Sequence, residues 1–229
     1  MRAFRIAELR IGKVRPLGPN AVPSGIDKVA VAGPLMAWAE GLEGDEQGDT
    51  RHHGGADKAL HAYPVAHYSV WANDLPERAA QFGPGAFGEN LVIEGATEDD
   101  SCLFDRYRLG GAIVEVSQTR QPCWRLNLRF DLCDMAARVQ QTGRTGWYFR
   151  VVSEGLITAG DRAELIARPC PNWPLTCVWR LLYRDTSDHD ALTAFAALPG
   201  LPENWRRMVD RRLARGTVED WRPRLETPG

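Results

Sequence analysis

The segment from Ser117 to Arg125 (SQTRQPCWR) combines residue types that favour thiol chemistry. Cys123 lies between Arg120 and Arg125, and guanidinium charge near a thiol favours the thiolate, which acts as a nucleophile or binds soft metals. The segment leaves the end of a predicted strand, where backbone N–H groups become free, and Pro122 stiffens the backbone that leads to the cysteine. These surroundings predict a functional Cys123 and are missing around the other cysteines, Cys102, Cys133, Cys170 and Cys177.

Four histidines fall within sixteen residues: His52, His53, His61 and His67. The intervals of eight and six residues that follow His53 do not place three ligands on one helix face, and no cysteine or aspartate stands at a zinc-like spacing. We therefore expect no zinc site. We expect His53, which precedes the flexible Gly54–Gly55 pair, to point into a pocket, and His67 to be solvated or hydrogen-bonded on a helix.

Two charged clusters have simpler interpretations. The acidic run Asp45, Glu46 and Asp49 predicts a solvated loop more strongly than a site for a divalent ion. A predicted helix over residues 203–215 carries arginines whose spacing fits the solvent face of an amphipathic helix, with docking of an acidic partner as the alternative. These residues are Arg206, Arg207, Arg211, Arg212 and Arg215.

Several well-known catalytic motifs are absent from the sequence. It contains no G-x-S-x-G nucleophile elbow, no Walker A loop and no H-E-x-x-H pair. Residues 83–88 do spell G-x-G-x-x-G, but the strand-like run ENLVI follows them instead of a helix, so they predict a turn and not a dinucleotide site.

Short β-like runs alternate with glycine-rich turns over residues 1–168. A helix is expected to begin with Pro64 in its first turn, and a second helix to run from an N-cap at Asp131 to Thr142, with Gly143 after its end. A two-residue turn at Gly110–Gly111 predicts a hairpin. The hydrophobic patterns predict strands at residues 4–14, 26–31, 58–63, 91–93, 107–109, 112–118, 147–152 and 163–167.

The pattern changes after three closely spaced prolines at positions 169, 171 and 174. Apolar residues with helical spacing then predict three short helices, at residues 176–183, 191–198 and 203–215, and no strand. The fold class is therefore mainly β within the α+β class. We predict a strand-rich domain over residues 1–168 and a small three-helix domain over residues 169–229.

Composition excludes several classes of protein. The chain has 229 residues, of which 44% are hydrophobic and 25% charged, as in soluble globular proteins. The net charge of −2 argues against electrostatic capture of nucleic acid. An odd number of cysteines without a C-x-x-C pair, and no apolar run of the length of a signal or membrane segment, predict a cytoplasmic protein with reduced thiols and no membrane partner.

Five motifs, in this order, resemble those of the MOSC domain and, more closely, of the bacterial YiiM-type proteins. They are GLEGD at 41–45, HGGADKALHAYP at 53–64, FGENL at 87–91, SQTRQPC at 117–123 and TGRTGW at 142–147. The resemblance covers nearly the whole chain, including the helical tail. It implies a β-barrel-like domain, a molybdenum cofactor (molybdopterin) with a cysteine thiolate as protein ligand, and reduction of N-hydroxylated compounds, such as N-hydroxylated nucleobases, as detoxification.

The resemblance also implies roles for individual residues. Cys123 would be the molybdenum ligand, because dithiolene and thiolate are both soft sulfur donors. The cofactor's phosphate needs fixed positive charge and backbone donors. The candidates are Lys58, Thr119, Arg120 and Arg125, with Arg51 and Arg144 behind them.

The remaining candidates concern the pterin ring, protons and electrons. Glu89 or Asn90 could read the donor–acceptor edge of the pterin. His53 and His61 could line the metal pocket and deliver the protons that loss of water from an N–OH group requires. No flavin motif or iron–sulfur spacing is present, so a separate reductase must supply electrons. The helical tail is a docking surface for that reductase or, equally, a packing module or homodimer contact.

Three other functions stay open. Cys123 could carry a persulfide and act as a sulfur carrier, which predicts labile sulfur and no molybdenum. The chain could bind or store the cofactor without catalysis. Residues 176–215 could bind DNA, although the small size of that region and the negative net charge argue against it.

Overall fold

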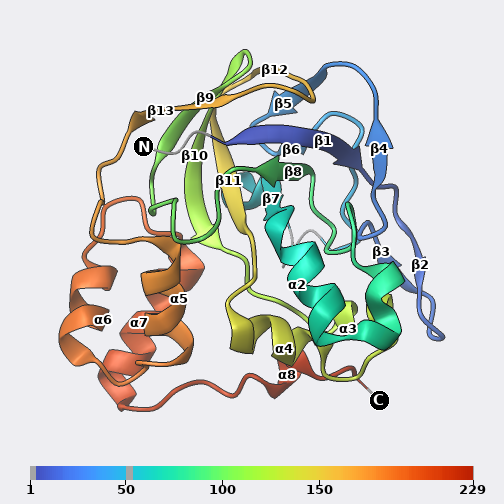
Figure 1. Ribbon diagram of the computed structural model, residues 1–229. Coiled ribbons are helices and arrows are strands. Elements are labelled where there is room, and N and C mark those ends of the chain that lie inside the picture. The colour runs from blue at the N-terminus through green and yellow to red at the C-terminus, as the bar shows by residue number, and fades with distance from the viewer. Residues whose placement is uncertain (1–3, 50–53, 229) are drawn as a thin grey trace.

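A curled sheet of eight strands forms the upper half of the molecule in Figure 1, and helices gather below it. This computed structural model describes residues 4–49 and 54–228. All neighbouring strands are antiparallel except β7 and β8. The order across the sheet is β13 (Ala163–Ala167), β9 (Arg106–Leu109), β10 (Ala112–Thr119), β11 (Trp147–Ser153), β7 (Leu60–Pro64), β8 (Leu91–Glu94), β1 (Arg5–Ile11) and β4 (Val29–Val31).

The sheet curls until the segment around β13, at one end, lies beside β1, the second strand from the other end. The N–H of Ile6 in β1 donates to the carbonyl of Asp161 at 2.9 Å, and Ala163 at the start of β13 donates to Phe4 at 2.8 Å. These bonds give the barrel-like shape that the sequence predicts. Two small sheets flank it, one of β12 (Gly155–Ile157), β5 (Leu35–Trp38) and β6 (Gly41–Leu42), the other of β2 (Arg15–Leu17) and β3 (Val22–Ser24).

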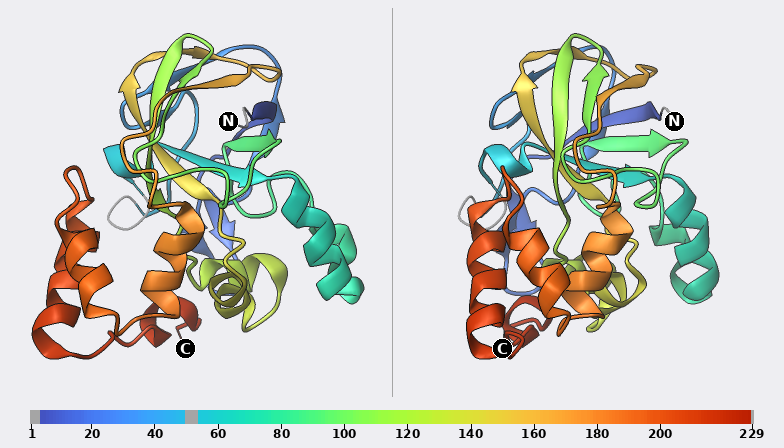
Figure 2. Two further views of the ribbon diagram at one scale, coloured as in Figure 1. Left: turned by 60° about the vertical axis from the view of Figure 1, so that its left-hand side comes forward. Right: turned by 90° about the vertical axis from the view of Figure 1, so that its left-hand side faces the viewer.

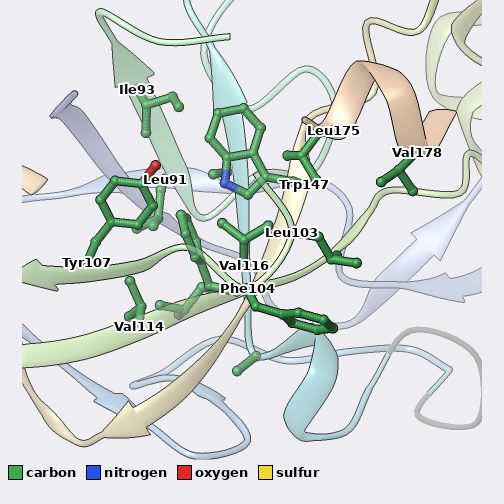
Figure 3. Close-up of a cluster of buried hydrophobic side chains, with 14 of the residues drawn as sticks. Leu91, Ile93, Leu103, Phe104, Tyr107, Val114, Val116, Trp147, Leu175 and Val178 are labelled. Atoms are coloured by element: carbon green, nitrogen blue, oxygen red, sulfur yellow. The ribbon is translucent and has the colours of Figure 1, made fainter. Parts of the chain in front are cut away.

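Aromatic side chains fill the inside of the curl. The ring of Phe4 lies edge-on to Tyr107 at 5.0 Å and to Trp147 at 6.5 Å, and Trp147 is fully buried. Figure 3 shows Trp147 between the sheet and the side chains of Leu175 and Val178. Because these two residues come from the first C-terminal helix, the helical region shares one hydrophobic core with the sheet.

A second hydrophobic core contains residues from Tyr63 to Val139. The stacked rings of Tyr63 and Phe87 are 4.3 Å apart, and Phe130 lies 5.1 Å from Phe87. Three helices contribute residues to this core: α2 (Ala66–Asp74), α3 (Arg125–Phe130) and α4 (Met135–Thr142). Two short 3₁₀ helices, η1 (Ala56–Lys58) and η2 (Pro76–Gln81), also lie in this part of the chain.

Helices alone follow residue 168, as the sequence predicts. They are α5 (Leu175–Tyr183), α6 (His189–Ala196), α7 (Glu203–Arg215) and the short α8 (Arg222–Leu225), which the sequence analysis misses. The prediction of a solvated arginine face on α7 is wrong for Arg212. This side chain is buried, donates to the carbonyl of Leu182 at 3.0 Å and pairs with Glu219 at 2.6 Å.

Two predicted helix starts are wrong. Pro64 is the last residue of β7, and α2 begins at Ala66. Asp131 does not cap the start of a helix; it ends α3 in the left-handed conformation (φ 48°), and α4 begins only at Met135. The predicted helix over residues 131–142 therefore begins too early, because residues 131–134 form the turn between α3 and α4. Gly143 does end α4 with φ 75°, as predicted.

The glycine-rich turns agree with prediction. Gly110–Gly111 joins β9 to β10, and the turn over residues 83–88 leads into strand β8 and not into a helix. In the described part of the chain, no helix has the length and apolar character needed to span a bilayer.

Candidate functional site

A small pocket of about 80 Å³ opens where β7, the end of β10 and two loops before η1 meet. Cys123, Arg120, His61, Lys28 and Asp45 are among the residues that line it. We refer to this cavity as the inner pocket.

A larger pocket of about 470 Å³ adjoins it, and we refer to it as the outer pocket. It extends to residues 204, 223 and 224 of the C-terminal region, so that region contributes to the site. The two pockets share Asp49, Lys58, Cys123, Arg125 and Tyr148. Cys123 therefore stands at the junction between the small inner pocket and the larger outer pocket.

The cysteine lies in an irregular segment between β10 and α3. The ladder of β10 ends where the N–H of Arg120 donates to Gly146 at 3.1 Å, and α3 begins as Leu126 donates to the carbonyl of Cys123 at 2.9 Å. The side chain of Cys123 is largely buried, with 8% of its surface exposed. None of the other four cysteines lines either pocket, and burial raises the pKa of Cys102 to about 11.

Three predicted cations meet at these pockets. Arg120 lines the inner pocket and is buried, and its Nη1 has no hydrogen-bond partner among the residues described. Lys58 lines both pockets, and burial lowers its pKa against the opposing influence of Cys123. Arg125 also lines both, 3.4 Å from Asp49 and over the ring of Trp124. A buried donor without a partner is costly, which favours an anion in this cavity.

His61 reaches the inner pocket from β7. Its Nε2 lies 3.5 Å from the carbonyl of Thr145, and its ring lies 5.0 Å from that of Tyr148. Burial, and then the charge of Arg120, hold the pKa of His61 well below 6.5. These effects oppose the predicted role of His61 as a proton donor at neutral pH, since the ring is then neutral. His53, the second predicted histidine, lies outside the described residues, as does Arg51.

In the FGENL segment, the carboxylate of Glu89 is hydrogen-bonded within the protein and does not face the pocket. The carboxylate of Glu89 accepts hydrogen bonds from the N–H groups of Gly85 (2.6 Å) and Phe87 (3.0 Å) and from the hydroxyl of Tyr68. Glu89 is fully buried and lines neither pocket, so the expectation that it reads a pterin edge is not supported. Its hydrogen bonds stabilise the turn that precedes β8.

Asn90 does line the inner pocket, but its amide is already engaged. Its oxygen accepts the N–H of His61 at 3.1 Å, and its nitrogen donates to Arg10 at 3.2 Å and to Asp45 at 2.9 Å. Among the other candidates, Thr119 is buried and lines neither pocket. Arg144 lies away from both, over the ring of Trp71.

A buried ion pair is the main feature that the sequence analysis misses. Lys28 and Asp45 pair in the wall of the inner pocket, with side chains only 6% and 4% exposed. The prediction of a solvated acidic loop is therefore wrong for Asp45, which also accepts the N–H of Gly12 at 2.7 Å. Seventeen residues separate the two partners, so local spacing carries no signal for the pair.

A hydrogen-bonded network lies behind the pocket. His67 is buried and contacts Glu98 at 2.7 Å, which agrees with the expectation of a hydrogen-bonded side chain. The other oxygen of Glu98 accepts the N–H of Gly146 at 2.7 Å. The network thus fixes the TGRTGW segment beside β7. Over residues 4–49 and 54–228, no group of three or more His, Cys, Asp or Glu side chains could bind a metal ion, so no zinc site is found there.

The geometry can now be compared with known proteins. The MOSC domain family matches residues 49–164, and the family described as YiiM-like, 3-alpha helix domain matches residues 173–216. The chain is 39% identical over 217 residues to protein YiiM of Escherichia coli (strain K12), which covers 93% of this chain and 95% of that protein. This chain belongs to the MOSC-domain proteins of the YiiM type.

Solved structures agree with this membership. The crystal structure of YiiM from Escherichia coli matches with a TM-score of 0.80 at 35% identity, over 94% of this chain and all of that one. The predicted family fold, a curled sheet with C-terminal helices, is therefore confirmed. A protein named "Reductase" from Gibberella moniliformis (strain M3125 / FGSC 7600) is 34% identical over 197 residues, which are 85% of this chain and 35% of that protein.

The residues present at the pockets fit the cofactor that the MOSC family implies. A phosphorylated pterin dithiolene with molybdenum needs a soft thiolate, fixed positive charge and free donors. Cys123 would supply the sulfur, and Arg120 would supply a buried guanidinium nitrogen that has no hydrogen-bond partner among the described residues. Lys58 and Arg125 add positive charge where the two pockets join.

Proposed function

We propose that this chain binds the molybdenum cofactor and reduces N-hydroxylated compounds, such as N-hydroxylated nucleobases, with Cys123 as the protein ligand of the metal. One observation carries the proposal: a largely buried thiol stands at the junction of two pockets, and the inner one is also lined by Arg120, which has a guanidinium nitrogen without a partner among the described residues. The family membership supports a cofactor of this class.

Each side chain has a defined task in this proposal. Cys123 binds the metal as a thiolate, and Arg120, Lys58 and Arg125 bind the cofactor's phosphate. When bound, the cofactor supplies two-electron redox chemistry. The outer pocket, at about 470 Å³, has the size of pockets that take small organic ligands, and Trp124 offers it an aromatic surface for a planar base.

The reaction consumes protons as well as electrons. Conversion of R–NH–OH to R–NH₂ and water takes up two electrons and two protons. Lys28 lines the inner pocket with a pKa that burial lowers, so its ammonium is a better proton source than an exposed lysine. The neutral ring of His61 donates or accepts a hydrogen bond there.

The electrons come from a separate reductase in this proposal, and we place the reaction in the cytoplasm. The similarity of this chain to about a third of the Gibberella protein named "Reductase" supports such a pairing. The C-terminal helices, which contribute residues to the outer pocket, are the surface we assign to the donor.

Molybdenum content and protection of cells test the proposal together. Protein purified gently from cells that make the cofactor should contain molybdenum, and the wild-type chain should protect a strain lacking other such reductases against 6-N-hydroxylaminopurine. Cys123→Ser should abolish both, because a hydroxyl is a hard, weakly acidic donor. Cys133→Ser, at an exposed thiol outside both pockets, should leave both unchanged.

The same experiment separates the alternatives. Protection that persists in cells with Cys123→Ser refutes the ligand role. Labile sulfur on Cys123 without molybdenum supports a sulfur carrier instead. Molybdenum that is bound by the wild-type chain, without protection or turnover in the presence of a competent reductase, supports a module that only binds the cofactor.

A further inference from the structure

The backbone around Cys123 receives little support from the sheet. Residues 120–123 have no regular secondary structure, and Pro122 has no N–H group to donate. On the helical side, the N–H of Leu126 donates to the carbonyl of Cys123 at 2.9 Å. Contacts that reach the residues next to Cys123 from other parts of the fold therefore act on the position of the thiol.

Arg224 in α8 supplies those contacts on both sides of the cysteine. The N–H of Trp124 donates to the carbonyl of Arg224 at 2.7 Å, and the guanidinium of Arg224 donates to the carbonyl of Pro122 at 2.5 Å. Another nitrogen of the same guanidinium donates to Oε1 of Gln140 in α4. One residue, a hundred positions along the chain, thus binds both neighbours of Cys123.

The short helix α8 is itself anchored to two parts of the molecule. Asn127 in α3 donates to the carbonyl of Leu225 at 2.8 Å, and Leu225 packs against the second core. The ring of Trp221 lies edge-on to Tyr183 at the end of α5, 5.5 Å away. Figure 1 shows α8 beneath α4, with the chain running to it from the other C-terminal helices. Both views in Figure 2 place it at the foot of the molecule, close to those helices.

We propose that Arg224 is a positioning residue for Cys123, through which the C-terminal helices set the place and accessibility of the thiol. Arg224 and Pro223 also line the outer pocket with Cys123, so a change in α8 reaches the site directly. The importance of Arg224 for the reaction rests on the proposed function, whereas its effect on the position of the Cys123 thiol does not.

The rate at which Cys123 is alkylated measures this effect. The full-length chain is purified from cells unable to make the cofactor, treated with iodoacetamide over a range of pH, and the modified cysteines are resolved by mass spectrometry. Arg224→Ala should speed alkylation of Cys123 about tenfold, since a charge-assisted hydrogen bond that keeps the segment closed is lost. The exposed Cys133 serves as the reference thiol and should not change.

A neighbouring arginine provides the matched control. Arg222 lies in the same helix, is exposed and pairs with Asp220 at 2.7 Å, so Arg222→Ala should leave the rate at Cys123 unchanged. Arg224→Lys keeps the charge but can reach only one of the two acceptors, so it should give a rise of about threefold. That partial rescue separates positioning of the thiol from a general loss of packing.

Three results would overturn the inference. They are a wild-type rate at Cys123 in a folded Arg224→Ala chain, an equal rise in Arg222→Ala, and a parallel rise at Cys133. If Arg224→Ala does not fold, a wild-type rate in Arg224→Lys overturns it as well. Absence of molybdenum from the wild-type chain would refute the proposed function and leave the role of Arg224 intact.

Discussion

Arg120 and His61 face the same small cavity, and only one of them is charged at neutral pH. Burial lowers the pKa of His61 well below 6.5, and the guanidinium of Arg120 lowers it further. Of these two side chains the arginine therefore carries the positive charge, and one of its nitrogens has no hydrogen-bond partner in the part of the chain that the structure describes. An anionic ligand here would meet a fixed charge and a neutral ring.

The neutral state of His61 predicts how stability depends on pH. Below about pH 6.5 the unfolded chain protonates this residue while the folded chain does not, so the unfolded state binds more protons and stability falls as pH decreases. The contribution is up to about 1.4 kcal/mol per pH unit in this range. Urea unfolding of the wild type and of His61→Gln at pH 7.5 and 5.5 should show a smaller loss in the variant.

An exposed histidine gives the comparison for this test. His189 stands at the start of α6 in solvent, so His189→Gln should keep the full loss of stability at pH 5.5. Equal losses in the wild type and in His61→Gln would show that His61 titrates in the folded chain as it does in the unfolded one.

Arg120→Met should separate cofactor binding from folding. A charge-assisted contact to phosphate contributes about 1.5–3 kcal/mol, so affinity for the cofactor should fall at least about tenfold. The cofactor-free chain should unfold within a few degrees of the wild type, because the variant removes both a buried nitrogen that has no partner among the described residues and the hydrogen bond between Arg120 and Tyr148. Thermal unfolding and molybdenum content measure the two effects.

The control for this change is an arginine outside both pockets. Arg138 pairs with Asp134 on the exposed side of α4, and Arg138→Met should retain molybdenum as the wild type does. If Arg120→Met instead lowers the unfolding temperature by many degrees and the folded fraction binds the cofactor normally, Arg120 is a structural residue.

The sequence predicts the strands of this fold better than its short helices. β8, β10, β11 and β13 appear where alternating patterns and glycine turns predict them, because burial of one face and tight turns leave local signals. The helix α3 has only six residues and follows Cys123 directly, so its periodicity is too short to detect. The four-residue helix α8 is hidden for the same reason.

The site shows a similar division. Cys123, Arg120 and Arg125 are neighbours in sequence, and their types alone indicate thiol and anion chemistry. Other contacts join segments that only the fold brings together. They are the ion pair of Lys28 with Asp45 and the hydrogen bond from Arg224 to the carbonyl of Pro122. No spacing in the sequence encodes such contacts. Glu89 lies in FGENL, one of the motifs that resemble those of the MOSC family. Its carboxylate nevertheless accepts hydrogen bonds from the backbone of a turn.

Gly146 should not tolerate a side chain. It adopts φ 65°, and an added Cβ would lie 2.3 Å from the carbonyl oxygen of Ala62 in β7. Gly146→Ala should therefore combine backbone strain with a clash beside His61 and lower the free energy of unfolding by more than about 2 kcal/mol. Gly160→Ala, at φ 97° with open space around it, isolates the strain alone and should cost less. Equal losses in urea unfolding would contradict the clash.

The buried pair of Lys28 and Asp45 predicts a large difference between two lysines. Lys28→Met leaves the carboxylate of Asp45 buried without its cation, and breaking a buried pair costs about 3–5 kcal/mol. Lys13 pairs with Glu46 at 2.9 Å at the surface, where solvent screens the pair, so Lys13→Met should cost far less than Lys28→Met. Urea unfolding of both variants at pH 7.5 measures the difference.

A second substitution identifies the cause of that loss. In Lys28→Met with Asp45→Asn, the amide carries no charge and its oxygen can keep the hydrogen bond from Gly12, but its nitrogen then faces the donating amide of Asn90. Part of the lost stability should therefore return. If the double variant is as unstable as Lys28→Met alone, packing around the lysine stem decides the effect and the charge of Asp45 does not. If Lys28→Met costs no more than Lys13→Met, Asp45 is solvated in solution and the inner pocket lacks its ion pair.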